Sequence, residues 1–161
     1  MDGGVDMINK MNLDAKTFKG IEFPVDRTSL RVTAAELKRF DEDKRKLRTM
    51  IMDAKKEFEV KYHIKPTPAY EKMEEICLIS VTSLKKTMNG SQHITRNFLY
   101  KLAVGLQMSV EEANRFFALC GGVLNEEYMA DYICIHALLD HDSIHDFCDQ
   151  FEKYTGIRIK R

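Results

Sequence analysis

Helix-start signals recur along this chain, and they constrain its fold more than any other feature. Thr33 and Ser109 each stand three residues before a glutamate, the capping-box pattern in which the two side chains satisfy free N–H groups at a helix start. Ser80 and Thr95 stand at similar positions, before segments with a helical spacing of apolar residues. The chain has only 3 Pro and 8 Gly in 161 residues, which favours helices over short strands and turns. We therefore predict an all-α fold.

Residues 33–64 predict one long amphipathic helix, ended by Pro66 and Pro68. Its apolar residues follow steps of three and four, close to a heptad, with Lys44 as an interruption. In one interpretation the helix folds back on its own domain. In the other, which the pattern slightly favours, it forms a coiled-coil dimer. The expected dimerisation residues are Leu37, Phe40, Leu47, Ile51 and Ala54.

Residues 65–161 predict a helical domain, whereas residues 1–32 show no firm period and suggest an irregular N-terminal arm. The expected helices of the domain are 68–77, 81–88, 96–106, 110–120, 125–139 and a last helix from Asp142 that ends at Gly156. Left-handed stops are expected at Asn89-Gly90 and at Gly121-Gly122. For 125–139 the face expected to point inward consists of Met129, Tyr132, Ile133, His136 and Leu139, and in the last helix Tyr154 is also expected to point inward.

Residues 79–90, 94–106 and 109–122 together resemble the Cro/repressor-type (XRE-like) bacterial helix-turn-helix superfamily. The resemblance covers roughly residues 55–157 and is nearest to a subgroup that adds two C-terminal helices after a fifth helix ended by glycine. It implies a helix-turn-helix-like five-helix domain with two added C-terminal helices, here preceded by the long amphipathic helix.

The function implied by this resemblance is that of a DNA-binding transcriptional regulator. The expected probing surface is Thr82, Ser83, Lys85 and Lys86 on helix 81–88, with Gln92, His93 and Arg96 as flanking contacts. Short hydroxyls near a helix start can contact phosphates or base edges, and lysines attract phosphates. No arginine or asparagine occupies the exposed positions of this helix, and those are the usual bidentate base readers.

The charge balance keeps a second function open. With 25 basic and 25 acidic residues the chain is not a strongly basic nucleic-acid binder, so any DNA contact must come from a local surface. The alternative is a non-catalytic protein-binding adaptor or inhibitor, for example a phage or defence-system modulator, built on the same scaffold. The expected partner is therefore either DNA or a protein.

Catalytic and metal-binding patterns are weak in this sequence. It contains no Gly-rich phosphate loop, His-Glu-x-x-His or Gly-x-Ser-x-Gly pattern, so we expect no enzyme and no cofactor. Potential zinc ligands are Cys134, His136, His141, His145 and Cys148, but without the paired spacing of structural zinc sites we expect no metal. The cysteines are expected to be reduced core residues. No signal peptide or apolar run of about 20 residues is present, which predicts a cytoplasmic protein without membrane contact.

Overall fold

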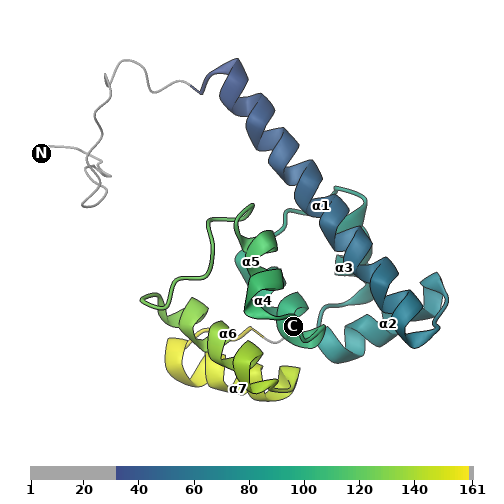
Figure 1. Cartoon of the computed structure of the whole chain (residues 1–161), viewed down its shortest axis with the longest axis vertical. Helices are drawn as coiled ribbons and strands as arrows, with labels where there is room; N and C mark the ends of the chain where they lie inside the picture. Colours follow the sequence, from purple (N-terminus) through teal and green to yellow (C-terminus); the bar gives the residue numbers. More distant parts are fainter. Residues whose placement is uncertain (1–31, 160–161) are drawn as a thin grey trace, which may run out of the picture. The chain divides into compact units, whose positions relative to one another are not determined.

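The computed structural model describes residues 32–159, and every regular element in that range is an α-helix (Figure 1). The all-α prediction is therefore confirmed. The helices are α1 (Ala34–Tyr62), α2 (Pro66–Cys77), α3 (Val81–Met88), α4 (Arg96–Gly105), α5 (Val110–Phe117), α6 (Met129–Asp140) and α7 (Ile144–Thr155). None of these helices has the length and apolar character needed to cross a membrane. The arm expected over 1–32 lies outside the described residues, apart from Val32.

Side-chain caps explain where most of these helices begin. Thr33 and Glu36 exchange two hydrogen bonds, of 2.8 and 3.1 Å, between the backbone of one and the side chain of the other. Ser109 and Glu112 form the same capping box at α5. Three starts differ from the prediction. Helix α7 begins at Ile144 instead of Asp142, because Ser143 caps it. Pro66 opens α2 because a first-turn proline has no N–H to satisfy, and α6 begins only at Met129 because residues 125–128 form a turn.

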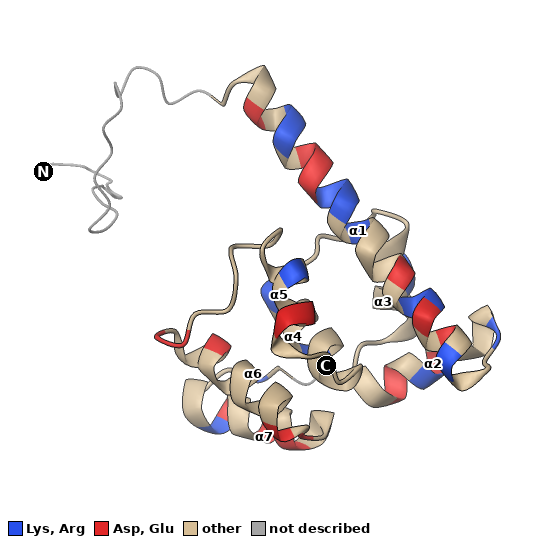
Figure 2. Cartoon of the chain, in the orientation of Figure 1, with Lys and Arg blue, Asp and Glu red and all other residues tan. Residues whose placement is uncertain are grey.

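Most of α1 packs into the domain that follows it. Of the described residues, those from Arg39 onward belong to one compact unit, which includes most of α1 as well as α2 to α7. The side chains of Leu47, Ile51 and Phe58 are buried in the domain core. Basic and acidic residues alternate on the rest of α1 (Figure 2), which is typical of a solvated helix face.

A buried lysine holds the end of α1 to α2. Lys55 is only 5% exposed, and its ammonium donates a hydrogen bond of 2.9 Å to the carbonyl of Pro66. The same ammonium pairs with Glu59 and lies 4.2 Å from the centre of the Tyr70 ring. An ion pair, a carbonyl and an aromatic face thus compensate the buried charge.

Helix α4 is the centre of the domain. It packs against α2, α5, α6 and α7, and six of its ten residues are buried. Gly105 allows α2 to come close, because a Cβ there would lie 2.5 Å from both the Ile76 carbonyl oxygen and the Cys77 sulfur. This close crossing positions α2, and through it the neighbouring α3.

The inward face of α6 differs from the prediction. Met129, Tyr132 and Leu139 are 51%, 45% and 60% exposed, and His136 is exposed as well. Of the predicted inward face only Ile133 is buried, and Tyr154 on α7 is also exposed. The buried residues of α6 include Asp131, Cys134, Ile135 and Leu138. Helix α6 has apolar residues on every face, so the spacing of its apolar residues does not determine which face points inward.

Candidate nucleic-acid interface

Helix α3 has well-defined ends. The side chain of Ser80 accepts a hydrogen bond of 3.1 Å from the backbone of Ser83, and the helix ends before Gly90, which has a φ of +86°. The link from α2 turns through Leu78 in the left-handed conformation, with φ of 54°. Lys101 of α4 donates a hydrogen bond of 3.0 Å to the carbonyl of Leu78. The turn between α2 and α3 is therefore fixed from both helix ends and from α4.

The two faces of α3 differ in burial, and of the expected probing surface Ser83 alone is not fully exposed. Leu84 and Thr87 are buried, while Thr82, Lys85 and Lys86 are exposed. Val81, Ser83 and Met88 are half-buried, Ser83 next to its contact with the Ser80 cap. The exposed side chains belong to neighbouring turns of one short helix, the arrangement that a groove-probing helix requires.

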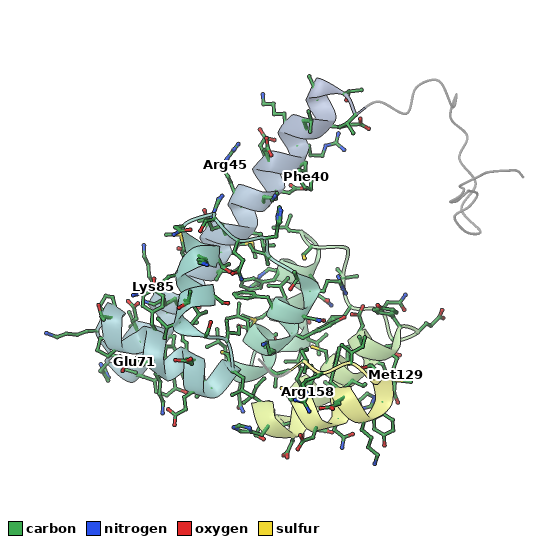
Figure 3. All side chains as sticks on the ribbon, turned by 180° about the vertical axis from the view of Figure 1, so that it is seen from behind. Phe40, Arg45, Glu71, Lys85, Met129 and Arg158 are labelled. Carbon is green, nitrogen blue, oxygen red and sulfur yellow. The ribbon has the colours of Figure 1, made fainter. Side chains whose placement is uncertain are left out.

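Carboxylates do not neutralise these lysines. Within residues 32–159, neither Lys85 nor Lys86 forms an ion pair. Lys85, labelled in Figure 3, lies with its ammonium 5.3 Å from the centre of the Tyr70 ring and remains exposed. The cluster of Thr82, Lys85 and Lys86, called here the α3 surface, is thus open to an anionic partner.

The loop after α3 presents two further predicted residues. Asn89 organises it by accepting hydrogen bonds from the backbone and the hydroxyl of Ser91, at 2.9 and 2.6 Å. His93 is exposed and Gln92 is half-buried. The ammonium of Lys44 on α1 lies 3.3 Å from Nδ1 of His93, so α1 reaches this loop. The sequence pattern treated Lys44 only as an interruption of a heptad and missed this contact.

Arg96 has a different environment from the one expected of a DNA-backbone contact. Its guanidinium donates to the carbonyls of Cys120 and Gly122, both at 2.7 Å, and to the carboxylate of Asp131, also at 2.7 Å. Because these partners fix it inside the domain, we remove Arg96 from the candidate DNA contacts. Its role is to fasten the glycine-containing segment after α5 to α4 and α6.

Asp131 is the acceptor at the centre of this network. Its side chain is only 3% exposed. Besides Arg96 it accepts hydrogen bonds from the hydroxyl of Tyr100 and, at 3.0 Å, from the backbone of Asn125. Burial and the hydrogen bond to Asp131 raise the pKa of Tyr100. The only sequence signal for this network was an aspartate inside the apolar stretch of α6.

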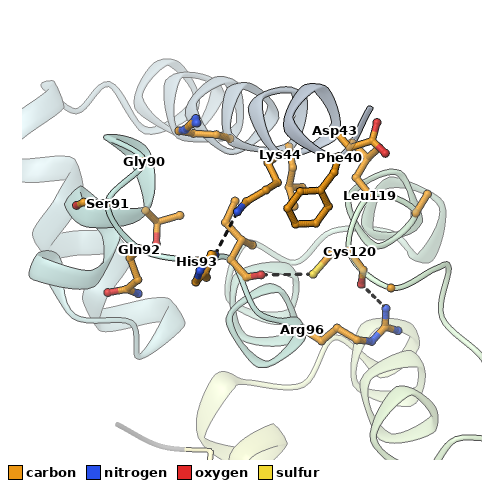
Figure 4. Close-up of a pocket in the computed structure, with 16 residues that line it drawn as sticks. Phe40, Asp43, Lys44, Gly90, Ser91, Gln92, His93, Arg96, Leu119 and Cys120 are labelled. Atoms are coloured by element: carbon orange, nitrogen blue, oxygen red, sulfur yellow. Dashed lines mark hydrogen bonds between the residues drawn. The ribbon is translucent and has the colours of Figure 1, made fainter. Parts of the chain in front are cut away.

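A cavity of about 610 Å³ opens between α1, the loop after α3 and the end of α5 (Figure 4). Its apolar lining includes Phe40, Leu47 and Ile94, and its basic lining includes Lys44 and Arg48. Thr87 also lines it, and its hydroxyl is the one buried side-chain oxygen or nitrogen in the described chain without a hydrogen-bond partner. No sequence pattern predicted this cavity, because its lining comes from three segments that lie far apart along the chain.

The unpartnered hydroxyl has a consequence for stability. We expect Thr87→Val to raise the free energy of unfolding by about 1–2 kcal/mol, because valine keeps the shape and removes a buried group that lacks a partner. Chemical denaturation with urea measures the change. Thr82→Val, on the exposed side of the same helix, is the matched control and should change stability by less than about 0.5 kcal/mol. A loss of stability in Thr87→Val would show that the hydroxyl is bonded.

The candidate zinc ligands do not gather. Among residues 32–159 no three or more histidine, cysteine, aspartate or glutamate side chains lie close enough together to hold a metal ion. Cys77, Cys134 and Cys148 are buried, and Cys120 is half-buried. Burial raises the pKa of the Cys77 thiol to about 12 and also raises the pKa values of Cys120 and Cys134, so these thiols are protonated at neutral pH.

The expected dimerisation residues fall into two groups. Leu47 and Ile51 are buried against the protein's own core, and Ala54 is half-buried beside it. They contribute to a dimer only if α1 leaves its domain. Leu37 and Phe40 are 52% and 58% exposed, so a dimer seam would be confined to the first turns of α1. Self-association through α1 stays a prediction.

Comparison with protein-family models, curated proteins and solved structures finds no match to this chain.

Proposed function

We propose that this protein is a DNA-binding transcriptional regulator of the helix-turn-helix type, in which α3 probes the major groove. The observation that carries the proposal is the α3 surface. A short helix with a fixed start and stop exposes a threonine and two lysines, and no carboxylate among residues 32–159 pairs with these lysines. Gln92 and His93 follow in the next loop and provide flanking contacts to the sugar-phosphate backbone.

The residue types of the α3 surface also set the kind of recognition expected. Lysines contact phosphates as point charges, whereas arginine and asparagine read bases through paired hydrogen bonds. The α3 surface has the former and lacks the latter. We therefore propose binding dominated by phosphate contacts, with base discrimination limited to Thr82 and the half-buried Ser83.

A salt titration tests this function. Fluorescence anisotropy measures the affinity for a random-sequence duplex between low and physiological salt. We expect affinity to fall steeply with salt, and Lys85→Ala together with Lys86→Ala to flatten the slope of log affinity against log salt by up to about 1.8, since each phosphate contact contributes about 0.9.

The matched control removes the same charge elsewhere. Lys56 and Lys153 are exposed on α1 and α7, and Lys56→Ala with Lys153→Ala should leave the slope near that of the unmodified protein. Equal flattening in both double variants would mean that net charge alone acts. Absence of binding at low salt, or binding that ignores salt and all four lysines, would reject the DNA-binding function.

A second candidate function is that of a protein-binding adaptor. It is favoured by an apolar and acidic surface on α6 and α7, which differs in chemistry from the basic α3 surface. The exposed side chains of Met129 and Tyr132 on α6 and of Tyr154 on α7 line a groove of about 710 Å³. The same groove is also lined by Asp140, Asp142, Asp146 and Asp149. An apolar groove with an acidic rim suits a basic partner peptide. A partner retained by Lys85→Ala/Lys86→Ala and lost by Met129→Ser/Tyr132→Ser would support this function over DNA binding.

A further inference from the structure

The cavity beside α1 is lined by charged residues, which a simple packing defect between apolar side chains would not have. Lys44 and Arg48 line it from the same face of α1, one helical turn apart. Within the described chain neither pairs with a carboxylate. Like charges at this spacing are unfavourable on a helix unless an anion is shared between them. The lining therefore leaves positive charge uncompensated at the rim of the cavity.

The lining is chemically divided. Phe40, Leu47 and Leu119 supply apolar surface, while Lys44, Arg48 and the hydroxyl of Thr87 are among the polar groups. Arg96 also lines the cavity, but its charge is already paired with Asp131. Thr87 is 1% exposed and its hydroxyl has no partner. A buried hydroxyl without a partner is unfavourable, and a ligand oxygen would satisfy it. Apolar walls with a few polar groups are typical of small-molecule sites, and 610 Å³ lies within their usual size.

The backbone around the cavity also fixes the cations. Gly90 lies under the guanidinium of Arg48, since a Cβ there would come within 3.3 Å of that group. The ammonium of Lys44 contacts His93 at 3.3 Å, and Figure 4 shows this pair beside the ring of Phe40. The two cations are thus held near the loop after α3 instead of extending into solvent.

We propose that this cavity binds a small organic acid, with its carboxylate at Lys44 and Arg48 and its apolar body against Phe40 and Leu119. The opposing charge on the lining is Asp43 alone, so a monoanion fits better than a cation. Such a ligand would also act on the loop that carries Gln92 and His93. That regulatory consequence rests on the proposed DNA-binding function, whereas ligand binding itself does not.

The test uses 2-naphthoate as the probe and its uncharged analogue 2-naphthamide as the matched ligand. Isothermal titration calorimetry on the full chain, without DNA, measures both affinities. A ligand of this size is expected to bind with a dissociation constant of about 1 mM or lower. We expect naphthoate to bind at least about tenfold more tightly than naphthamide, because one charge-assisted contact contributes about that factor.

Substitutions distinguish binding in the cavity from non-specific binding elsewhere on the protein. Lys44→Met with Arg48→Met should abolish the preference for naphthoate over naphthamide. Arg45→Met with Lys46→Met, on exposed neighbours that do not line the cavity, should leave it unchanged. Thr87→Val should weaken naphthoate binding several-fold while the midpoint of thermal unfolding without ligand rises, a combination that a purely structural role of Thr87 does not give.

Cys120 supplies an independent readout because it lines the cavity, while the three other cysteines are buried. Naphthoate should slow the alkylation of Cys120 by N-ethylmaleimide, as followed by peptide mass spectrometry. Equal affinity for acid and amide, or a preference that survives Lys44→Met with Arg48→Met, or unchanged alkylation at saturating naphthoate, would each overturn the proposal. Because no arm includes DNA, these failures are distinguishable from failure of DNA binding.

Discussion

Asp131→Ala should lower the free energy of unfolding by about 3–5 kcal/mol, the range measured when one partner of a buried charged network is removed. The substitution leaves the guanidinium of Arg96, the hydroxyl of Tyr100 and the backbone of Asn125 without their shared acceptor. Since Arg96 remains 23% exposed and keeps its carbonyl partners, we expect the lower part of this range. Urea denaturation followed by circular dichroism measures the effect.

Asp131→Asn refines the same experiment. Asparagine keeps the shape and one acceptor oxygen but loses the charge, so we expect a smaller loss, of about 2 kcal/mol. Asp140→Asn, on an exposed residue of the same helix, is the matched control and should change stability by less than about 0.5 kcal/mol. If Asp131→Ala were as mild as this control, the network would not join α4 to α6 in solution.

Gly105→Ala should destabilise the protein by about 1–3 kcal/mol or more, although helix propensity alone predicts a gain of about 1 kcal/mol. The added Cβ would stand 2.5 Å from the carbonyl oxygen of Ile76 and 2.7 Å from the Cα of Cys77. These are backbone atoms, which cannot rotate away, so α2 and α4 must separate. The sign of the change therefore decides between local propensity and close packing.

The Cys77→Ala background provides a control for this second prediction. It removes the sulfur that also lies 2.5 Å from the added Cβ but leaves the two backbone contacts. We expect Gly105→Ala to remain destabilising in that background, though by less. Urea denaturation of the four proteins in this double-mutant cycle gives the coupling. Stabilisation by Gly105→Ala in either background would show that α2 and α4 are further apart than the structure places them.

The sequence alone determined features that depend on neighbouring residues. The all-α class and the starts of α1, α3, α4 and α5 followed from Thr33, Ser80, Thr95 and Ser109, because a capping hydroxyl bonds to a backbone N–H only three residues away. The exposure of Thr82, Lys85 and Lys86 followed from helical spacing within a single short helix. These interactions are local, so the order of residues is enough to specify them.

Only the tertiary structure decided what depends on partners far along the chain. Arg96 was expected at a DNA backbone, yet its acceptors lie 24 to 35 residues away, on the segment after α5 and on α6. The inward face of α6 also depends on distant residues. The same is true of the cavity, which brings Lys44, Thr87 and Cys120 together. Whether such a side chain points toward solvent or toward the core is decided by the helices packed around it. The spacing of residues adjacent in the sequence does not specify that packing.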